Sequence, residues 1–451
     1  MAEQDTGLEA QIASWTQYLR RRRAVAGADV EELEGHLRDQ VDHLVRAGLS
    51  EEEAFFVAIK RMGSLDEVSR EYAREHSERL WKQLVIDDSP SPARRPRAFV
   101  VVAGLALGAA LAMKVPALFG VTFSGDPDFY LLNAGLLVLP FLAAYFAWTR
   151  RVSATVIVVV AATFAMTAVI LNVYPFTPDG MTMALAALAA LVVLWLAVGV
   201  AYAGGLWRSD TMRMDFIRFT GEWVVYYTLI ALGGAVLVAL TMGVFGAIGL
   251  DAGRVVEEWI IPCGAAGAVV VAAGLVEAKQ SVIENIAPVL TKLFTPLFTA
   301  MLLALVVAAL IQRDLLETSR DLLIIFDVVL VVVLGLLLYS LSARDPESKP
   351  GWFERLQLVM VSSAIVVDAL VLIAMLARIG AFGFSANKVA SLGLNVILLV
   401  NLAWSGYLLI GILRGTVRPA QLEKWQTGYV PVYLAWALIV MIVFPPVFSF
   451  T

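Results

Sequence analysis

The chain contains few of the residues on which most metal and redox sites are built. It has a single cysteine, Cys263, and its three histidines all lie before residue 77. One cysteine allows neither an intrachain disulfide nor a cysteine-based metal site. The apolar part that follows has no histidine, which excludes histidine-ligated haem, histidine-bound zinc and a histidine general base there. We therefore expect no metal, no cofactor and no catalytic residue, and the sequence argues on balance against an enzyme.

Charge is also scarce, and it is unevenly distributed. Charged residues make up 16% of the chain and hydrophobic residues 59%, with a mean hydropathy of +0.77, whereas soluble domains carry about 25% charged residues. The formal net charge of -5 argues against a nucleic-acid partner, which would require a basic face. Acidic and basic residues concentrate in residues 1–90. This division predicts a soluble N-terminal domain followed by a membrane domain.

Long apolar segments are what the chain has in abundance. Each is longer than the ~17 residues that a helix needs to cross the hydrocarbon core of a bilayer. The sequence therefore predicts an all-α fold, with a small cytoplasmic helical bundle followed by a polytopic α-helical membrane bundle of about 11 spans that contacts lipid. The predicted spans cover residues 98–120, 128–148, 153–174, 181–205, 219–249, 256–275, 294–312, 321–342, 356–378, 389–413 and 430–449.

Residues 1–85 carry the signals of a small helical domain. Apolar residues recur there at three- and four-residue spacing, which predicts helices that each bury one face. Ser50 with Glu53, and Ser64 with Glu67, form two predicted capping boxes that mark helix starts. The Pro- and Arg-rich residues 86–97 predict a short extended linker to a transmembrane domain of residues 98–451.

Three patterns in the N-terminal domain carry a family resemblance. They are ELE-x-HL at Glu32–Leu37, GLS-x-EEA at Gly48–Ala54 and an R-hydrophobic-G helix end at Arg61–Gly63. The stretch resembles the permease prefix (HAAS-type) domain of bacterial membrane proteins. The resemblance implies a cytoplasmic regulatory or interaction domain without catalysis, and hence a cytoplasmic protein partner that binds through residues 1–85.

Four short motifs in the apolar part extend the resemblance. They are TGEW at Thr220–Trp223, EAKQS at Glu277–Ser281, SARDP at Ser342–Pro346 and FPP at Phe444–Pro446. This part resembles an uncharacterised family of bacterial polytopic membrane proteins that share the prefix domain, a domain of unknown function. The resemblance implies the bacterial inner (cytoplasmic) membrane and a topology, but little of a mechanism.

The basic residues of the short loops predict the orientation, because cytoplasmic loops carry the excess of lysine and arginine. With the N-terminus in the cytoplasm, 16 basic residues lie inside and 5 outside, and an odd span count places the C-terminus outside. The inside set is Arg94, Arg95, Arg97, Arg150, Arg151, Arg208, Arg213, Arg218, Lys279, Lys292, Arg344, Lys349, Arg355, Arg414, Arg418 and Lys424; the outside set is Arg254, Arg313, Arg320, Arg378 and Lys388.

Two amphipathic stretches predict helices that lie on the membrane surface. Residues 276–293 combine one apolar face with several charges, so we expect a cytoplasmic interfacial helix, with a re-entrant segment as the alternative. The overlong fifth span is expected to begin as an interfacial helix near Met212–Arg218. Glycine pairs such as Gly104/Gly108 and Gly243/Gly246 predict close helix packing within the bundle, with a homo-oligomer as the alternative.

Charged side chains inside the apolar segments are the candidate functional residues. Asp368 lies about 12 residues, or ~18 Å, into the ninth predicted span. A carboxylate at that depth costs at least ~2.5 kcal/mol, so we expect it to be neutral or paired with a cation. It is either a hydrogen-bond donor between helices or a proton carrier. Lys114 and Asp327 have opposite charge at similar depth, which predicts an ion pair, with an ion pathway as the alternative.

Further polar residues complete the candidate intramembrane site. Arg218 and Glu222 are four residues apart, as in a local helical ion pair. Asn401 is expected to form an interhelical hydrogen bond, as are Asn133, Asn172 and Asn395. The candidate site therefore consists of Asp368, Asp327, Lys114, Glu222, Arg218 and Asn401.

Three functions remain open from the sequence, in decreasing order of preference. The first is a permease- or transporter-like protein, ion- or proton-coupled, with a cytoplasmic regulatory domain. The second is a membrane sensor whose N-terminal domain binds a partner. The third is an intramembrane lipid-modifying enzyme, against which the missing histidines stand. A tunnel that reaches Asp368 would favour transport, and a lateral cleft lined by carboxylates would favour an enzyme.

Overall fold

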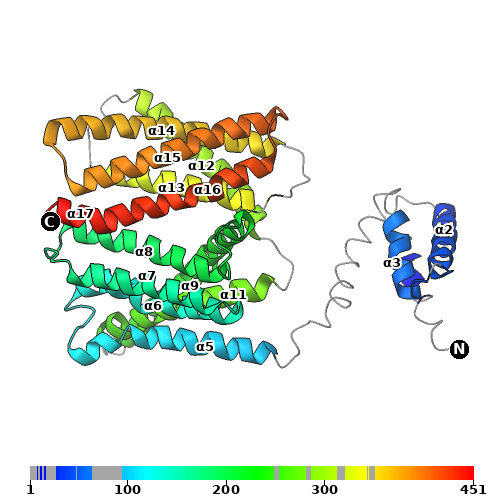
Figure 1. Ribbon diagram of the computed structural model, residues 1–451, viewed down its shortest axis with the longest axis horizontal. Coiled ribbons are helices and arrows are strands. Elements are labelled where there is room, and N and C mark those ends of the chain that lie inside the picture. Colours follow the sequence, from blue (N-terminus) through cyan, green and yellow to red (C-terminus); the bar gives the residue numbers. More distant parts are fainter. Residues whose placement is uncertain are drawn as a thin grey trace. The chain divides into compact units, whose positions relative to one another are not determined.

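The structure is a computed structural model in which two compact units form, Met1–Ala98 and Phe99–Thr451, and each is described by itself (Figure 1). Every regular element in the described part of the chain is a helix, which confirms the predicted all-α fold. The described residues are 8, 11–12, 15–16, 27–46, 48–62, 94–247, 253–280, 286–311, 320–342, 344 and 351–451.

The N-terminal unit contains helices α2 (Gly27–Arg46) and α3 (Glu51–Met62), which pack against each other. One capping box begins α3 as predicted, because the Glu53 amide donates to Ser50 Oγ and the Ser50 amide donates to Glu53 Oε2 at 3.1 Å. The predicted box at residues 64–67 and most of the predicted linker lie outside the described residues. The core consists of Ile12, Trp15, Leu37, Val41, Leu44, Ala54, Phe55, Ala58 and Ile59.

Eleven helices of the described part of the second unit are long and apolar enough to cross a membrane, which confirms the predicted number of spans. The chain is an integral membrane protein. Its main helices are α5 (Arg94–Ala112), α6 (Pro127–Thr149), α7 (Ala154–Val173), α8 (Met181–Tyr202), α9 (Asp210–Ala247), α11 (Ile261–Gln280), α12 (Ile286–Ile311), α13 (Arg320–Ser342), α14 (Trp352–Phe382), α15 (Ala386–Leu413) and α16 (Pro419–Leu438). Shorter elements adjoin them: η1 (Val115–Phe119), α10 (Gly253–Val255), η2 (Val256–Ile260), η3 (Ile439–Val443) and α17 (Phe444–Val447).

The membrane helices form two groups that meet at α8, α9 and α16. Helices α5–α8 pack with α9 and α11 in one group, and α12–α15 form the other around a large apolar core. A further core joins α7 and α8 to α15, α16, η3 and α17. In Figure 1 most of these helices run side by side, with α14 at one edge and α5 at the other.

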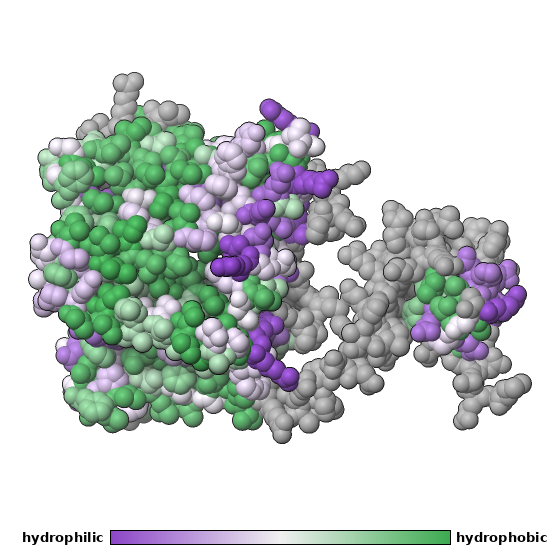
Figure 2. Space-filling model, in the orientation of Figure 1, coloured by the Kyte–Doolittle hydropathy of each residue, from purple (hydrophilic) through white to green (hydrophobic). Residues whose placement is uncertain are grey.

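The two ends of the membrane unit are named here by residues that lie at them. The Thr451 face carries the loops at 120–126, 174–180 and 383–385, and the Arg150 face carries those at 150–153, 203–209 and 414–418. Hydrophobic side chains cover the middle of the visible surface, and the strongly hydrophilic ones gather at the end opposite the C-terminus (Figures 1 and 2). Which face is cytoplasmic stays a prediction.

Neither predicted interfacial helix is a separate element in the described residues, and a location on the membrane surface stays a prediction. Helix α9 is continuous from Asp210 to Ala247, so its first two turns are the start of the span itself. Residues 276–280 continue α11, and residues 286–293 begin α12. The charge that suggested a surface helix is neutralised from another element, because Arg150 Nη2 pairs with Glu277 Oε1 at 2.9 Å. With its charge paired, Glu277 does not end the helix.

Two smaller expectations also need correction. Helix α5 begins at Arg94, inside the predicted linker, because a proline such as Pro96 is tolerated in the first turn, where amides lack helical partners anyway. Gly108 is closely packed as expected, since a Cβ there would lie 2.6 Å from the Phe141 ring. Gly243 and Gly246 face open space among the described residues, so their predicted packing within the bundle is wrong.

Candidate functional site

Asp368 lies in the middle of α14. The helix has 31 residues, which places Asp368 ~24 Å from its first residue and ~21 Å from its last. A capping contact fixes the start of the helix, where the Gly351 amide donates to Glu354 Oε2 at 2.6 Å. Helix α14 packs against α12, α13 and α15, so Asp368 faces other helices and is 0% exposed. The predicted central depth of this carboxyl group is confirmed.

The Asp368 carboxyl group is left without a matching partner. Neither of its oxygens has a hydrogen-bond partner among the described residues. The one charged group there that acts on it is Asp327, another carboxyl group. Asp368 is fully buried and Asp327 is half-buried, so two acidic side chains meet at a site to which the described residues supply no cation.

Asp327 and Asn395 connect Asp368 to the rest of the bundle. Asn395, 0% exposed on α15, donates its amide to Asp327 Oδ1 at 2.9 Å. The same nitrogen lies 3.5 Å from Met375 Sδ, and the Ser391 side chain lies close to Asp327. Asn395 Oδ1 has no partner in the described part of the chain. We call Asp327, Asp368 and Asn395 the carboxyl cluster.

A cavity of about 460 Å³ opens toward the Thr451 face above the carboxyl cluster. Its lining includes Met375 and Ser391, the two residues that contact the cluster. At the other end Phe384, which is 78% exposed, stands at the rim. Arg378 and Lys388 also line the cavity. The cavity therefore leads from the surface to side chains that lie beside Asn395 and Asp327.

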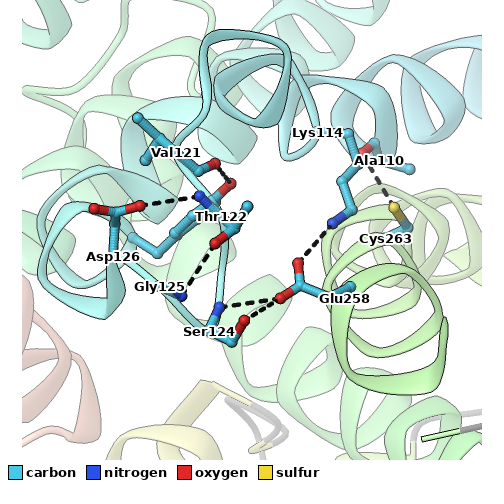
Figure 3. A network of polar contacts seen from close by, with 10 residues as sticks. Ala110, Lys114, Val121, Thr122, Ser124, Gly125, Asp126, Glu258 and Cys263 are labelled. Carbon is cyan, nitrogen blue, oxygen red and sulfur yellow. Dashed lines mark hydrogen bonds and ion pairs between the residues drawn. The ribbon is translucent and has the colours of Figure 1, made fainter. Parts of the chain in front are cut away.

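The predicted ion pair between Lys114 and Asp327 is wrong. Lys114 Nζ lies 3.4 Å from Glu258 Oε2 (Figure 3). The same Nζ lies 4.8 Å from the centre of the Trp259 ring. The other oxygen of Glu258 accepts hydrogen bonds from the amide and the hydroxyl of Ser124. Lys114 and Asp327 belong to different helix groups, and a nearer acid therefore takes the lysine. We call Lys114, Ser124 and Glu258 the ion-pair site.

The remaining predicted residues lie apart from the carboxyl cluster. Arg218 and Glu222 are near the Tyr339 side chain, where α9 meets α13, and Glu222 is 5% exposed. Their expected pairing with each other stays a prediction. Asn401 exchanges two hydrogen bonds of 3.1 Å with Gln426 of α16.

The expectation that asparagines within the spans join helices is confirmed. Asn133 of α6 and Asn172 of α7 exchange hydrogen bonds of 3.1 and 2.9 Å. Asn395 joins α15 to α13, and Asn401 joins α15 to α16. An amide that crosses between helices meets its hydrogen-bonding needs where water is absent. Of these contacts, the one made by Asn395 belongs to the carboxyl cluster.

Sequence reasoning missed several residues of these sites. Glu258 was taken as part of a span start, although it shares the depth of Lys114 on a helix of the same group. Arg378 was counted only as a basic loop residue, and Ser391 and Gln426 were not considered. The available signal was polar side chains close to the ends of apolar runs, which hydropathy averages conceal.

The described residues show no grouping of three or more histidine, cysteine, aspartate or glutamate side chains that could hold a metal ion. Comparison with protein-family models, with curated proteins and with solved structures gives no match to this chain. The resemblance of residues 32–76 to the permease prefix domain therefore stays a prediction, and the functional argument rests on the geometry described above.

Proposed function

We propose that this integral membrane protein is a proton-coupled transporter of the bacterial inner membrane, with residues 1–85 as a cytoplasmic regulatory domain and the C-terminus outside. One observation carries the proposal. A fully buried carboxyl group at the centre of α14, with no hydrogen-bond partner among the described residues, lies beside a second carboxyl group below an open cavity.

A structural role explains this arrangement poorly. Polar groups inside membranes are retained where they bind partners or mark a pathway for ions and protons. A carboxyl group that served only to join helices would hydrogen-bond across them, as Asn401 does with Gln426. Asp368 makes no such bond in the described residues. A site that binds and releases a proton needs unused hydrogen-bonding capacity, which this carboxyl group has.

The access route supports the same conclusion. Ser391 and Met375 form part of the cavity wall and contact Asp327 and Asn395 respectively. A proton that enters from the Thr451 face can therefore pass from the cavity to Asp327 and on to Asp368. Secondary transporters hold their coupling sites near the bilayer midplane and expose them to one side at a time.

The test compares proton movement in reconstituted vesicles that contain a luminal pH dye, under an imposed pH gradient with the membrane potential clamped. We expect the wild type to move protons faster than empty vesicles do, and Asp368→Asn to fall to the empty-vesicle rate while remaining folded. Glu258→Gln is the matched control, because it removes a carboxylate from the ion-pair site, and it should retain flux. Unchanged flux in Asp368→Asn would remove this residue from the mechanism.

Infrared difference spectroscopy gives an independent reading of the same carboxyl group. In detergent, titration from about pH 4 to about pH 10 covers the range over which shifted carboxyl groups ionise. We expect a carbonyl band of a neutral carboxyl group that disappears with rising pH in the wild type and is missing from Asp368→Asn. An identical series of spectra from the two proteins would contradict a titrating Asp368.

A sensor is the second candidate, and one observation favours it. The N-terminal unit has its own buried core around Trp15 and Phe55, as a separable partner-binding domain would have. Wild-type vesicles without proton flux would favour this reading. For a lipid-modifying enzyme we find no comparable support, because the groove of about 400 Å³ between α8, α9, α13 and α16 has no carboxylate among its described lining residues.

A further inference from the structure

The charged side chains in the described lining of the cavity above the carboxyl cluster are all cationic. Two of its lining residues, Arg378 of α14 and Lys388 of α15, are cationic, and its described lining includes no aspartate or glutamate. The remaining lining is apolar or neutral, with Met181, Phe384 and Phe448 among its members. A cavity with low-dielectric walls and one sign of charge concentrates solutes of the opposite sign.

Arg378 has an unused hydrogen-bond donor. Its Nη1 atom is buried and has no partner in the described part of the chain. A buried donor without an acceptor is costly, and a guanidinium group presents its donors in a plane that matches the two oxygens of a carboxylate or phosphate. The arginine side chain is therefore prepared for an oxyanion that no described side chain supplies there.

Lys388 is held at the same cavity by its own loop. Its Nζ donates to the Gly383 carbonyl at 2.9 Å and lies 5.6 Å from the centre of the Phe382 ring. Gly383 has φ +74, a left-handed conformation that favours glycine, and the loop thereby presents its carbonyl to the lysine. An ammonium group has three donors, so two remain for a ligand.

We propose that this cavity binds a small oxyanion, a carboxylate or a phosphate, through Arg378 and Lys388, and that this anion is the solute that moves with the proton. The claim that this anion moves with the proton rests on the proposed function. The volume of about 460 Å³ falls within the ~300–1,000 Å³ of small-molecule sites. The anion makes charge-assisted hydrogen bonds with Arg378, which supply the acceptor that Nη1 lacks.

The carboxyl cluster gives this site its coupling. An anion in the cavity lies near Asp327, because Ser391 lines the cavity and its side chain is close to Asp327. An ionised Asp327 or Asp368 repels the anion, and a proton taken up from water onto the carboxylate removes that repulsion. Proton and anion therefore bind cooperatively, and by linkage each raises the affinity for the other by the same factor.

The experiment measures binding by isothermal calorimetry on the full-length protein in neutral detergent. The probes are succinate, gluconate and inorganic phosphate, with choline as a cation of similar size. We expect at least one of the three anions to bind and choline not to bind. Arg378→Gln should weaken anion binding at least about tenfold, as expected when a charge-assisted pair is lost. Arg378→Lys, which keeps the charge, should recover part of it.

A matched control lies on the same face. Arg254 is exposed and outside the cavity, so Arg254→Gln should bind anions as the wild type does. Equal weakening by Arg254→Gln and Arg378→Gln would overturn the site, because only general surface charge would then matter. The same binding measurement is made in phosphatidylcholine vesicles with and without phosphatidylglycerol. If phosphatidylglycerol abolishes succinate binding, the cavity binds a lipid headgroup, and the proposal of a soluble anion is overturned.

The anion site and the proton pathway can fail separately. If no anion binds while proton flux still depends on Asp368, the anion site is overturned and proton transport stands. If anions bind in an Arg378-dependent manner and no flux occurs, the site stands and coupled transport is overturned. If both hold, a succinate, gluconate or phosphate gradient should drive proton entry in the wild type and not in Asp368→Asn.

Discussion

Two regions of the membrane unit hold acidic side chains, Glu258 partly exposed and Asp368 fully buried, and they provide partners for them in opposite ways. In the ion-pair site, one oxygen of Glu258 pairs with Lys114, and the other accepts hydrogen bonds from the amide and the hydroxyl of Ser124 (Figure 3). In the carboxyl cluster, Asp327 accepts a hydrogen bond from Asn395, and Asp368 accepts none from the described residues. The first site has its bonding needs met and ties a loop to η2. In the second site, carboxyl oxygens lack hydrogen-bond partners, which is typical of groups that bind a proton or a ligand transiently.

The largest effect is therefore expected when each region loses its carboxyl group. Asp368→Asn should abolish proton flux while leaving the thermal unfolding temperature close to that of the wild type, because no described hydrogen bond is lost. Glu258→Gln should retain flux and lower the unfolding temperature, because it breaks the contact with Lys114. Flux assays in vesicles and unfolding scans in detergent measure both. The opposite pattern, with flux lost in Glu258→Gln alone, would reverse the assignment of the two regions.

A double-mutant cycle tests which acidic residue forms an ion pair with Lys114. Lys114→Met should lower the unfolding temperature, because it leaves Glu258 without its cation. The double change Lys114→Met with Glu258→Gln should recover part of that loss, since coupled groups are not additive. Lys114→Met with Asp327→Asn should be additive. Additive losses with Glu258 and recovery with Asp327 would restore the pairing expected from the sequence.

The properties that could be predicted from the sequence are those that depend on one stretch of the chain alone. The number of spans and the central depth of Asp368 follow from a long apolar run around one acid, and both were predicted. The asparagine contacts were also expected, because a buried amide must find a partner between helices. None of these conclusions requires knowing which helices are neighbours.

Which side chains pair with each other depends on which helices are neighbours in the membrane plane. The depth of a residue along its span does not give this information. Lys114 and Asp327 lie at similar predicted depth, but α5 and α13 belong to different helix groups, so Glu258 is the nearer acid. The partner of Glu277 was missed for the same reason, because its cation, Arg150, comes from the loop after α6. The cavity is formed by residues distant in sequence, from Met181 to Thr451, and no single segment signals it.

A buried polar site with all its needs met should behave like the ion-pair site, with a moderate effect on stability alone. Asn401 and Gln426 are 0% and 1% exposed and exchange two hydrogen bonds, and Gln426 also donates to Ser405 at 2.7 Å. Gln426→Leu should cost about 1 kcal/mol, the usual scale of hydrogen bonds between membrane helices. Flux should persist. Chemical unfolding in detergent measures the loss, and a stability equal to the wild type would show that this network adds nothing.

The smallest effect is expected outside the membrane, where a carboxylate is fully hydrogen-bonded and also fully exposed. The Ser50 amide, and after it the Ser50 hydroxyl, lower the pKa of Glu53 from its ordinary value. A lowered pKa in the folded state adds stability above the unfolded pKa, and that stability is lost as the pH falls through the folded pKa. At neutral pH, Glu53→Gln should therefore reduce the amide-exchange protection of α3 slightly in the full-length protein, and the difference should vanish in acid. Glu51→Gln, a change two residues earlier on the same exposed turn, is the control for the loss of one carboxylate outside the capping box. A difference between wild type and Glu53→Gln that stays constant down to low pH would mean that the titrating carboxylate contributes nothing, and that helix capping alone protects α3.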